Sequence, residues 1–181
     1  MNALGMIELN NIPKGIEAAD AMLKAAEVEL TTAQAVCAGK YIAIVSGEVA
    51  AVKSSVAAGV EIAADKLVDS IVIPNVDDQV LAAVCACTEI DYMGAVGIME
   101  TFSLAAAVIA ADAAVKAADV ELIEVRLGRG LGGKSFIVLT GDVAACKAAV
   151  EAACSMDEVS GLMNECVVIP SPHKDLIQTL V

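Results

Sequence analysis

The chain repeats itself along its length. The stretch AADAMLKAAEVEL at residues 18–30 returns as AADAAVKAADVEL at residues 110–122, with ten of thirteen positions identical and an offset of 92. The offset grows to 94 between GKYIAIVSGEVAAVKSSV (39–56) and GKSFIVLTGDVAACKAAV (133–150), and to 96 between SIVIP (70–74) and CVVIP (166–170). Such a duplication predicts two tandem domains of one fold. We place them at residues 1–92 and 93–181.

Each repeat predicts the same order of elements. In the first copy, ALGMIEL predicts a strand, and VELTTAQAV and KYIAIVSG predict two more strands around a short loop at residues 37–40. Between them lies a predicted helix with Pro13 in its first turn. Its apolar residues recur at three- and four-residue steps, which predicts a core-facing stripe of Ile16, Ala19, Leu23 and Ala26.

The second half of the repeat completes the pattern. Glu48 predicts the start of a second helix, because an acidic side chain suits the positive end of the helix dipole. DSIVIP predicts a strand that ends at Pro74, and DDQVLAAVCA predicts a closing helix capped by Asp77 or Asp78. The order βαββαβ predicts an α+β fold of two tandem ferredoxin-like domains, each with an antiparallel sheet and helices on one face.

Composition and charge exclude several classes of partner. Hydrophobic residues make up 58% of the chain and aromatic residues only 2%, which predicts cores of small aliphatic side chains in closely packed layers. The 24 acidic and 11 basic residues give a net charge of −13, which disfavours nucleic acid and anionic membranes as partners. The sequence shows no apolar run of membrane-spanning length and no export signal, so we expect a soluble cytoplasmic protein.

Six cysteines are present, at positions 37, 85, 87, 146, 154 and 166. They lack C-x-x-C spacing, and we expect reduced thiols. Cys85 and Cys87 would point apart on the predicted closing helix, which disfavours a zinc site. Apart from Cys37, the cysteines are predicted to be small buried hydrophobic residues.

The stretch GRGLGGKS at residues 128–135 matches the pattern of a phosphate-binding loop. A phosphate loop leads into a helix, whose N-terminus supplies the anion site. Here the next residues, SFIVLTG, predict a strand, and the first repeat has only VCAGKY at the corresponding place. We therefore predict a hairpin loop of the shared fold and no nucleotide hydrolysis.

The repeats resemble a known family. The two βαββαβ units, the A-D-x-x-x-K-A-A-x-V helix end, the GDV helix start and the VIPSPH stretch at residues 168–173 are similar to the bacterial microcompartment (BMC) shell domain. The resemblance implies a structural, non-enzymatic protein of the microcompartment shell, in which a homotrimer forms a pseudohexamer. Its implied partners are other shell proteins and encapsulated redox enzymes. The loop between the second and third strands lines the pore in this family, which implicates Ala38, Gly39, Lys40, Gly128, Arg129, Gly130, Leu131, Gly132, Gly133 and Lys134.

Among tandem members, the chain resembles the T-type shell proteins of propanediol-utilisation compartments. Their pore loop reads C-P-G-K, where this chain has Cys37-Ala38-Gly39-Lys40. The resemblance implies that Cys37 from each of three chains holds one [4Fe-4S] cluster per trimer for electron transfer, with a non-protein ligand on the fourth iron. Leu131 takes the corresponding place in the second repeat.

Two other functions remain open at this stage. The first is a shell pore without a cluster, in which the glycines of the second loop gate the passage of a small metabolite. The second is an oligomeric small-molecule sensor built on the same repeats. Lys40 and Lys134 either offset the charge of a cluster or solvate their loops, and we expect His173 to be structural or to lie at a subunit edge.

Overall fold

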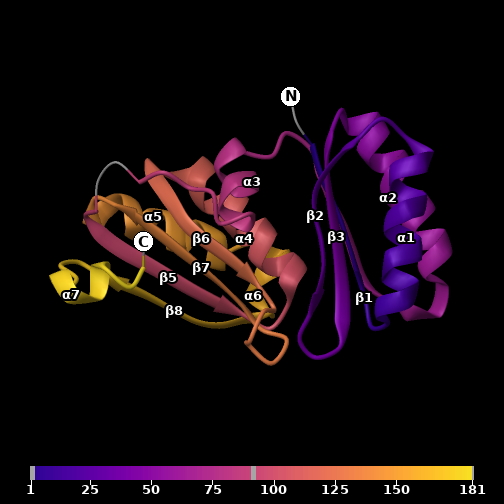
Figure 1. Cartoon of the computed structure of the whole chain (residues 1–181). Coiled ribbons are helices and arrows are strands. Elements are labelled where there is room, and N and C mark those ends of the chain that lie inside the picture. Colours follow the sequence, from indigo (N-terminus) through magenta and orange to yellow (C-terminus); the bar gives the residue numbers. More distant parts are fainter. Residues whose placement is uncertain (1–2, 91–92, 181) are drawn as a thin grey trace. The chain divides into compact units, whose positions relative to one another are not determined.

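The chain forms two compact units, Met1–Val76 and Asp77–Val181 (Figure 1). The structure is a computed structural model and describes residues 3–90 and 93–180. The boundary predicted between residues 92 and 93 falls beside residues 91 and 92, which lie outside the described residues. Each unit has a four-stranded antiparallel sheet with helices packed on it, which confirms the predicted α+β fold.

The first unit has the predicted order of strands and helices. Asn11 caps the first helix by accepting a hydrogen bond from the Lys14 N–H (2.9 Å), Pro13 lies in its first turn, and Glu48 directly precedes the second helix. The strands are arranged β2-β3-β1-β4. The elements are β1 (Ala3–Leu9), α1 (Ile12–Ala25), β2 (Glu29–Val36), β3 (Lys40–Gly47), α2 (Val49–Ala63), a 3₁₀ turn (Ala64–Lys66) and β4 (Leu67–Ile73).

The second unit repeats this arrangement with the strand order β6-β7-β5-β8. Helix α3, which was predicted to close the first repeat, belongs to this unit and packs against β6 and α4. Asp77 caps it, accepting from the Gln79 N–H at 3.0 Å. The elements are α3 (Asp78–Val84), β5 (Ala95–Thr101), α4 (Leu104–Ala117), β6 (Val120–Leu127), β7 (Ser135–Gly141), α5 (Val143–Cys154), α6 (Asp157–Ser160), β8 (Met163–Ile169) and α7 (Lys174–Ile177).

The duplication extends to irregularities of the backbone. The pairing of β2 with β3 shifts register between Leu30 and Thr32, and the pairing of β6 with β7 shifts at the corresponding place. A second shift, where β1 pairs with β4, recurs where β5 pairs with β8. The two repeats therefore share one backbone plan, so that residues at matching positions can be compared directly.

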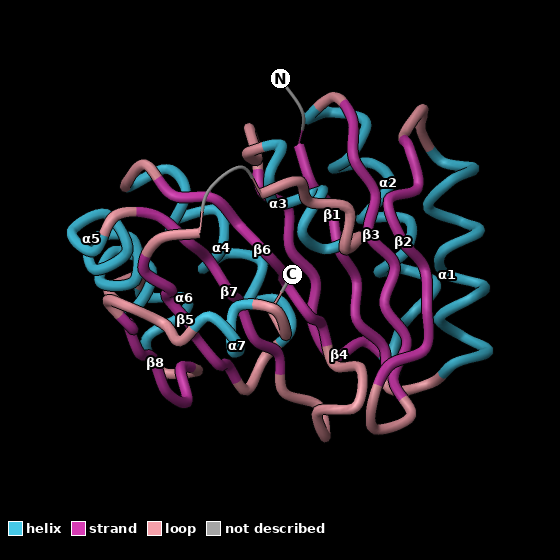
Figure 2. The backbone as a smooth tube through the Cα atoms, turned by 60° about the vertical axis from the view of Figure 1, so that its left-hand side comes forward, coloured by secondary structure: helices cyan, strands magenta, loops and turns pink. Residues whose placement is uncertain are grey.

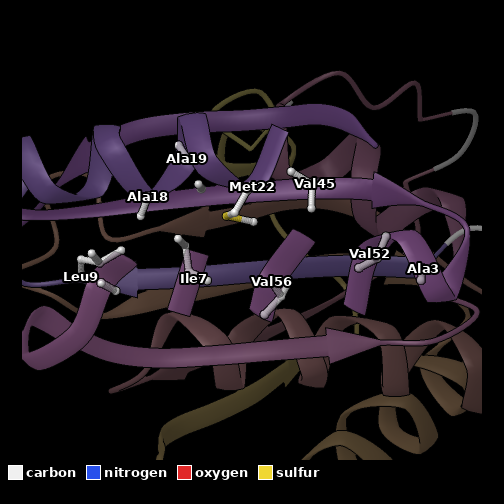
Figure 3. Packing of buried hydrophobic residues seen from close by; sticks show 11 residues of the cluster. Ala3, Ile7, Leu9, Ala18, Ala19, Met22, Val45, Val52 and Val56 are labelled. Atoms are coloured by element: carbon white, nitrogen blue, oxygen red, sulfur yellow. The ribbon is translucent and has the colours of Figure 1, made fainter. Parts of the chain in front are cut away.

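In the first unit the core lies between the sheet and the two helices α1 and α2, which lie side by side on one face (Figure 2). Ile7 of β1, Met22 of α1 and Val56 of α2 meet there (Figure 3). Gly59 of α2 lets the helices approach closely, because a Cβ at this position would lie 2.6 Å from Cγ of Met22. The closely packed layers of small side chains agree with the prediction from composition.

The predicted core stripe of α1 is wrong in most of its members. Of the four residues, only Ala19 is buried, while Ile16 is 55% and Leu23 is 39% exposed. The face that packs against α2 and the sheet consists instead of Gly15, Ala18, Ala19 and Met22. The smaller residues are turned inward, and the larger apolar side chains point away from the core.

No helix within residues 3–90 and 93–180 combines the length and the apolar character needed to cross a membrane.

Candidate metal centre and pore loops

Two hairpin loops occupy matching places in the two units. Residues 37–39 join β2 to β3, and residues 128–134 join β6 to β7. The second loop therefore connects two strands, which confirms the hairpin predicted for GRGLGGKS. A strand follows this loop where a phosphate-binding loop has a helix.

Cys37 directly follows β2 and is half-buried, while Ala38 and Gly39 are exposed. The peptide bond between Cys37 and Ala38 is cis. Gly39 has a φ of +75°, a conformation that glycine adopts without steric cost, and no atom lies within 4 Å of the place a Cβ would take. The thiol thus stands in the short loop of a hairpin, and the open space in that loop lies beside Gly39.

The second loop is built on glycines. Gly128, Gly130, Gly132 and Gly133 have φ values of 68°, 74°, 63° and 93°. Residues with side chains rarely adopt such angles, so the glycines permit a succession of tight turns. Leu131 is half-buried and its carbonyl accepts a hydrogen bond from the Lys134 N–H at 3.2 Å.

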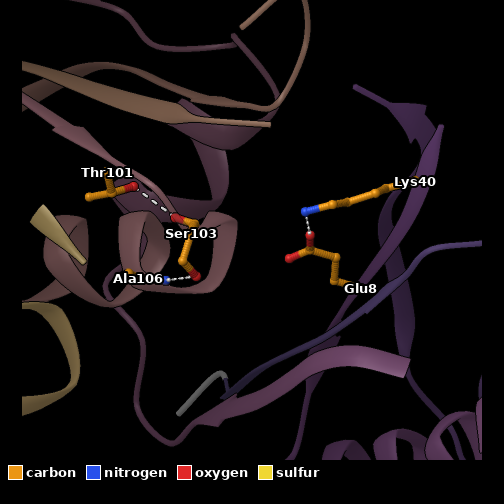
Figure 4. A network of polar contacts seen from close by, with 5 residues as sticks. All are labelled: Glu8, Lys40, Thr101, Ser103 and Ala106. Atoms are coloured by element: carbon orange, nitrogen blue, oxygen red, sulfur yellow. Dashed lines mark hydrogen bonds and ion pairs between the residues drawn. The ribbon is translucent and has the colours of Figure 1, made fainter. Parts of the chain in front are cut away.

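The lysine of each loop forms an ion pair with a glutamate on the first strand of its own repeat. Lys40 Nζ lies 2.7 Å from Oε1 of Glu8, whose side chain is only 3% exposed (Figure 4). Lys134 Nζ lies 2.8 Å from Oε1 of Glu100, and its hydrogen bond holds the pKa of that carboxyl below the ordinary value. Each lysine charge is therefore largely matched within its own unit.

The two arginines of the second hairpin differ in their surroundings. Arg126 donates from Nε and Nη2 to the two carboxylate oxygens of Glu124, at 2.6 and 2.9 Å, and its guanidinium lies over the ring of Phe136. Arg129 is exposed in the loop itself. The charge of Arg126 is thus matched by a carboxylate on the same strand.

The prediction that the other five cysteines are buried is wrong for three of them. Cys146 is buried and Cys154 is half-buried, but Cys85, Cys87 and Cys166 are exposed. Helix α3 ends at Val84, so Cys85 and Cys87 lie beyond the helix on which they were expected. Burial is the main cause that raises the pKa of the Cys146 thiol.

Within the described part of the chain, no group of three or more His, Cys, Asp or Glu side chains could hold a metal ion. A metal centre at Cys37 would therefore need ligands from other copies of the chain. His173 caps α7, its Nδ1 accepting from the Asp175 N–H at 3.2 Å, which agrees with the structural role expected for it.

The family model named BMC domain matches the chain twice, at residues 3–76 and 95–172. The chain belongs to the BMC domain family. This confirms the tandem resemblance seen in the sequence, and each of the two matches spans one sheet with its helices.

Individual relatives are similar to nearly the whole chain or to about half of it. The bacterial microcompartment shell protein PduT of Citrobacter freundii is 43% identical over 99% of this chain and 97% of its own. The shell protein EutM of Salmonella typhimurium is 45% identical over 46% of this chain and 85% of its own, the span of about one BMC domain. The crystal structure of a microcompartment protein from Desulfitobacterium hafniense has a TM-score of 0.94 and 50% identity, and the match covers 98% of this chain and 99% of that one.

Proposed function

We propose that three copies of the chain form one pseudohexameric tile of a microcompartment shell, with a [4Fe-4S] cluster held at the three-fold axis by Cys37. Membership of the BMC family and the similarity to PduT support the shell role, which is structural and not enzymatic. Other shell proteins are the expected neighbours of the tile, and encapsulated redox enzymes are the expected electron partners.

The observation that carries the cluster is the placement of Cys37. Iron–sulfur clusters are held by cysteine thiolates, and this half-buried thiol stands in the short hairpin loop between β2 and β3, directly after β2. One chain offers a single such ligand there, while a three-fold axis turns one cysteine per chain into three. When bound, the cluster supplies one-electron transfer across the shell.

The residues around the thiol suit a negatively charged group only modestly. Lys40 follows in the same loop, but its charge is already matched by Glu8. The second loop carries Leu131 at the place of the cysteine, so that it adds no further thiolate. The cluster would thus rest on the three thiolates and the non-protein ligand of its fourth iron.

The decisive test is Cys37→Ser, purified and reconstituted with iron and sulfide without oxygen. The wild-type chain is expected to bind about four iron atoms per three chains and to give an EPR signal on reduction. Cys37→Ser should lose both while it remains a trimer. Cys87→Ser, which replaces another exposed cysteine, is the matched control and should keep its iron. A colourless wild-type chain, or iron retained by Cys37→Ser, would contradict the cluster.

The glycines of the second loop favour a second candidate, a gated pore for a small metabolite. A Cβ at Gly130 or Gly132 would meet no atom within 4 Å, so the space beside these two residues is open. The iron measurement separates the two functions, because the pore needs no metal.

A further inference from the structure

Helix α3 follows the last strand of the first repeat, as α7 follows the last strand of the second. The packing of α3 can therefore be compared with the surroundings of α7. In the second unit, α3 packs along the edge strand β6. The Gln79 side chain bonds to this edge twice: Oε1 accepts from the Leu122 N–H at 3.0 Å, and Nε2 donates to the Val120 carbonyl at 3.4 Å. The apolar side of the helix is buried, through Val80, Ala83 and Val84.

A second anchor holds the start of α3 on helix α4. The Asp77 N–H donates to Oδ1 of Asp112 at 2.9 Å, while Oδ2 of Asp112 binds Lys116 Nζ at 2.5 Å. Asp112 is only 6% exposed. A helix docked in this way covers the sheet edge with apolar contacts and satisfies its polar groups.

The matching surface of the first unit is exposed. Leu30 of β2 corresponds to Leu122 and is 47% exposed, where Leu122 is 1% exposed. Asp20 corresponds to Asp112; its Oδ2 binds Lys24 Nζ at 2.6 Å in the same manner, but its side chain is 59% exposed. Ile16 and Leu23 share the face of α1 with Asp20, since they lie four and three residues away. We call Ile16, Asp20, Leu23 and Leu30 the edge patch.

Helix α7 of the second repeat matches α3 of the first. At the offset of 96, Asp175 takes the place of Gln79, and Leu176 and Leu180 take the places of Val80 and Val84. His173 caps α7 as Asp77 caps α3, each accepting from the backbone N–H two residues later. Yet Leu176 is 41% exposed, where Val80 is fully buried.

We propose that α7 of one copy docks on the edge patch of a second copy, as α3 docks on β6 and α4. Leu176 would cover Leu30, and the His173 N–H would donate to Asp20, while Leu180 stays packed against Val96, Ile123 and Val138 of its own unit. The contact is head-to-tail, since each copy offers one α7 and one edge patch, and such contacts form a ring where the rotation between copies closes, as in the proposed trimer. The inference rests on the proposed trimer and identifies a surface that would close it.

Charge also favours a second copy as the occupant. Lys174 of α7 stands where α3 has Asp78, and the exposed side chains beside Leu30 are Glu27 and Glu29. Asp175 retains the acceptor that Gln79 Oε1 offers to the edge strand. Lys174 of the incoming helix and the two glutamates of the receiving edge are thus of opposite charge.

The test measures the mass in solution of the full chain and of two lysine variants. The wild-type trimer should have about three times the 18.3 kDa of one chain. Leu30→Lys alters the edge patch and Leu176→Lys alters α7. Either should weaken assembly by about 100-fold or more, because an unpaired charge would be buried in the contact, and should leave monomers at micromolar concentration.

Leu162→Lys is the matched control. Leu162 is 40% exposed, and the first repeat already has Lys66 at the corresponding place, so this variant should remain trimeric. Circular dichroism checks folding, and if Leu30→Lys fails to fold, Leu176→Lys decides, since its side chain lies outside both cores. Trimers of Leu176→Lys overturn the docking and leave the proposed function standing. A wild-type chain that stays monomeric overturns both.

Discussion

The two repeats place residues of different size at the same point of one fold. In the first unit, Gly15 of α1 faces Tyr41 of β3, and a Cβ at residue 15 would lie 2.5 Å from the Cβ of Tyr41. In the second unit, the matching positions hold Ala107 and Ser135, both buried. After duplication the helix and the strand have thus diverged together, so a residue from one repeat fits the other only with its neighbour.

The largest effect on stability should come from substituting residue 15 without changing its neighbour Tyr41. Gly15→Ala should lower the free energy of unfolding by about 1–3 kcal/mol, because the added methyl overlaps the base of the Tyr41 side chain, which cannot rotate away. Urea unfolding measures the change. The double variant Gly15→Ala/Tyr41→Ser reproduces the pair of the second repeat and should be less destabilised than the sum of its single variants.

The reverse change in the second unit is the control. Ala107→Gly should cost only about 1 kcal/mol, the ordinary penalty of a glycine within a helix. An unchanged stability of Gly15→Ala would mean that α1 can shift away from β3, and the two repeats would then be interchangeable at this point.

The two loop lysines offer a second comparison. Glu8 is 3% and its partner Lys40 is 27% exposed, whereas Glu100 and Lys134 are 30% and 38% exposed. Glu8→Gln should therefore cost about 2 kcal/mol, because it leaves a partly buried ammonium without its carboxylate. Glu100→Gln should cost less than about 1 kcal/mol, as exposed ion pairs do. Equal losses of unfolding free energy in the two variants, measured with urea, would mean that the greater burial of the Glu8 pair does not make its loss more costly.

The pH dependence of the Glu100 pair has a definite sign. Lys134 lowers the pKa of Glu100 in the folded chain. The stabilisation is therefore present above the pKa of the unfolded carboxyl and is lost as the pH falls through the lowered pKa. Between neutral pH and the acid range, the difference in stability between the wild type and Glu100→Gln should shrink.

Most of the fold could be predicted from the sequence because its signals are local. Pro13, Glu48 and Asp77 mark helix starts by backbone and capping chemistry that needs no partner, and all three lie where they were expected. The order of elements followed from alternation and turns, and the duplication supplied a second copy of each signal.

The wrong predictions concern packing between residues that are distant in sequence, which local sequence patterns do not record. An apolar stripe has the same periodicity whether it faces a core or a partner, so Ile16 and Leu23 were assigned to the core although they are exposed. That α3 joins the second unit depends on a sheet edge distant in sequence. The error in α1 is informative, since Ile16 and Leu23, the two exposed residues assigned to the core, belong to the edge patch.

For the candidate site, aligning the repeats found both loops but missed the glutamates that pair with their lysines. A signal was present: Glu8 and Glu100 are the charged residues of two largely apolar strands and recur at the offset of 92. Whether Cys37 holds a metal depends on other copies of the chain, and no pattern within one chain contains that geometry.

The cysteines of the second repeat give a third contrast. Cys154 and Cys166 stand where the first repeat has Val60 and Ser70. Burial, together with the neighbouring Cys166, raises the pKa of Cys154 to about 12. Because the thiolate is the reactive form, iodoacetamide at pH 8 should modify Cys154 at least about tenfold more slowly than the exposed Cys87. Mass spectrometry of peptides follows both rates, and equal rates would show that Cys154 ionises normally.

The smallest effect concerns Ser135, the counterpart of Tyr41. Its hydroxyl is buried and has no hydrogen-bond partner within the described residues. Ser135→Ala should therefore raise the free energy of unfolding by about 1 kcal/mol, because it removes a polar group that lost water on folding and gained nothing in return. Thr140→Val is the matched control on the same strand, since Thr140 Oγ1 donates to the Ala95 carbonyl at 2.9 Å and its loss should destabilise by a similar amount. A thermal midpoint that rises in Ser135→Ala and falls in Thr140→Val would show that the Ser135 hydroxyl is unsatisfied. The second repeat then tolerates an unsatisfied hydroxyl at the position where the first repeat packs the ring of Tyr41. A loss of stability in Ser135→Ala would instead mean that the hydroxyl finds a partner, and the exchange of Tyr for Ser would then have added a polar contact to the core.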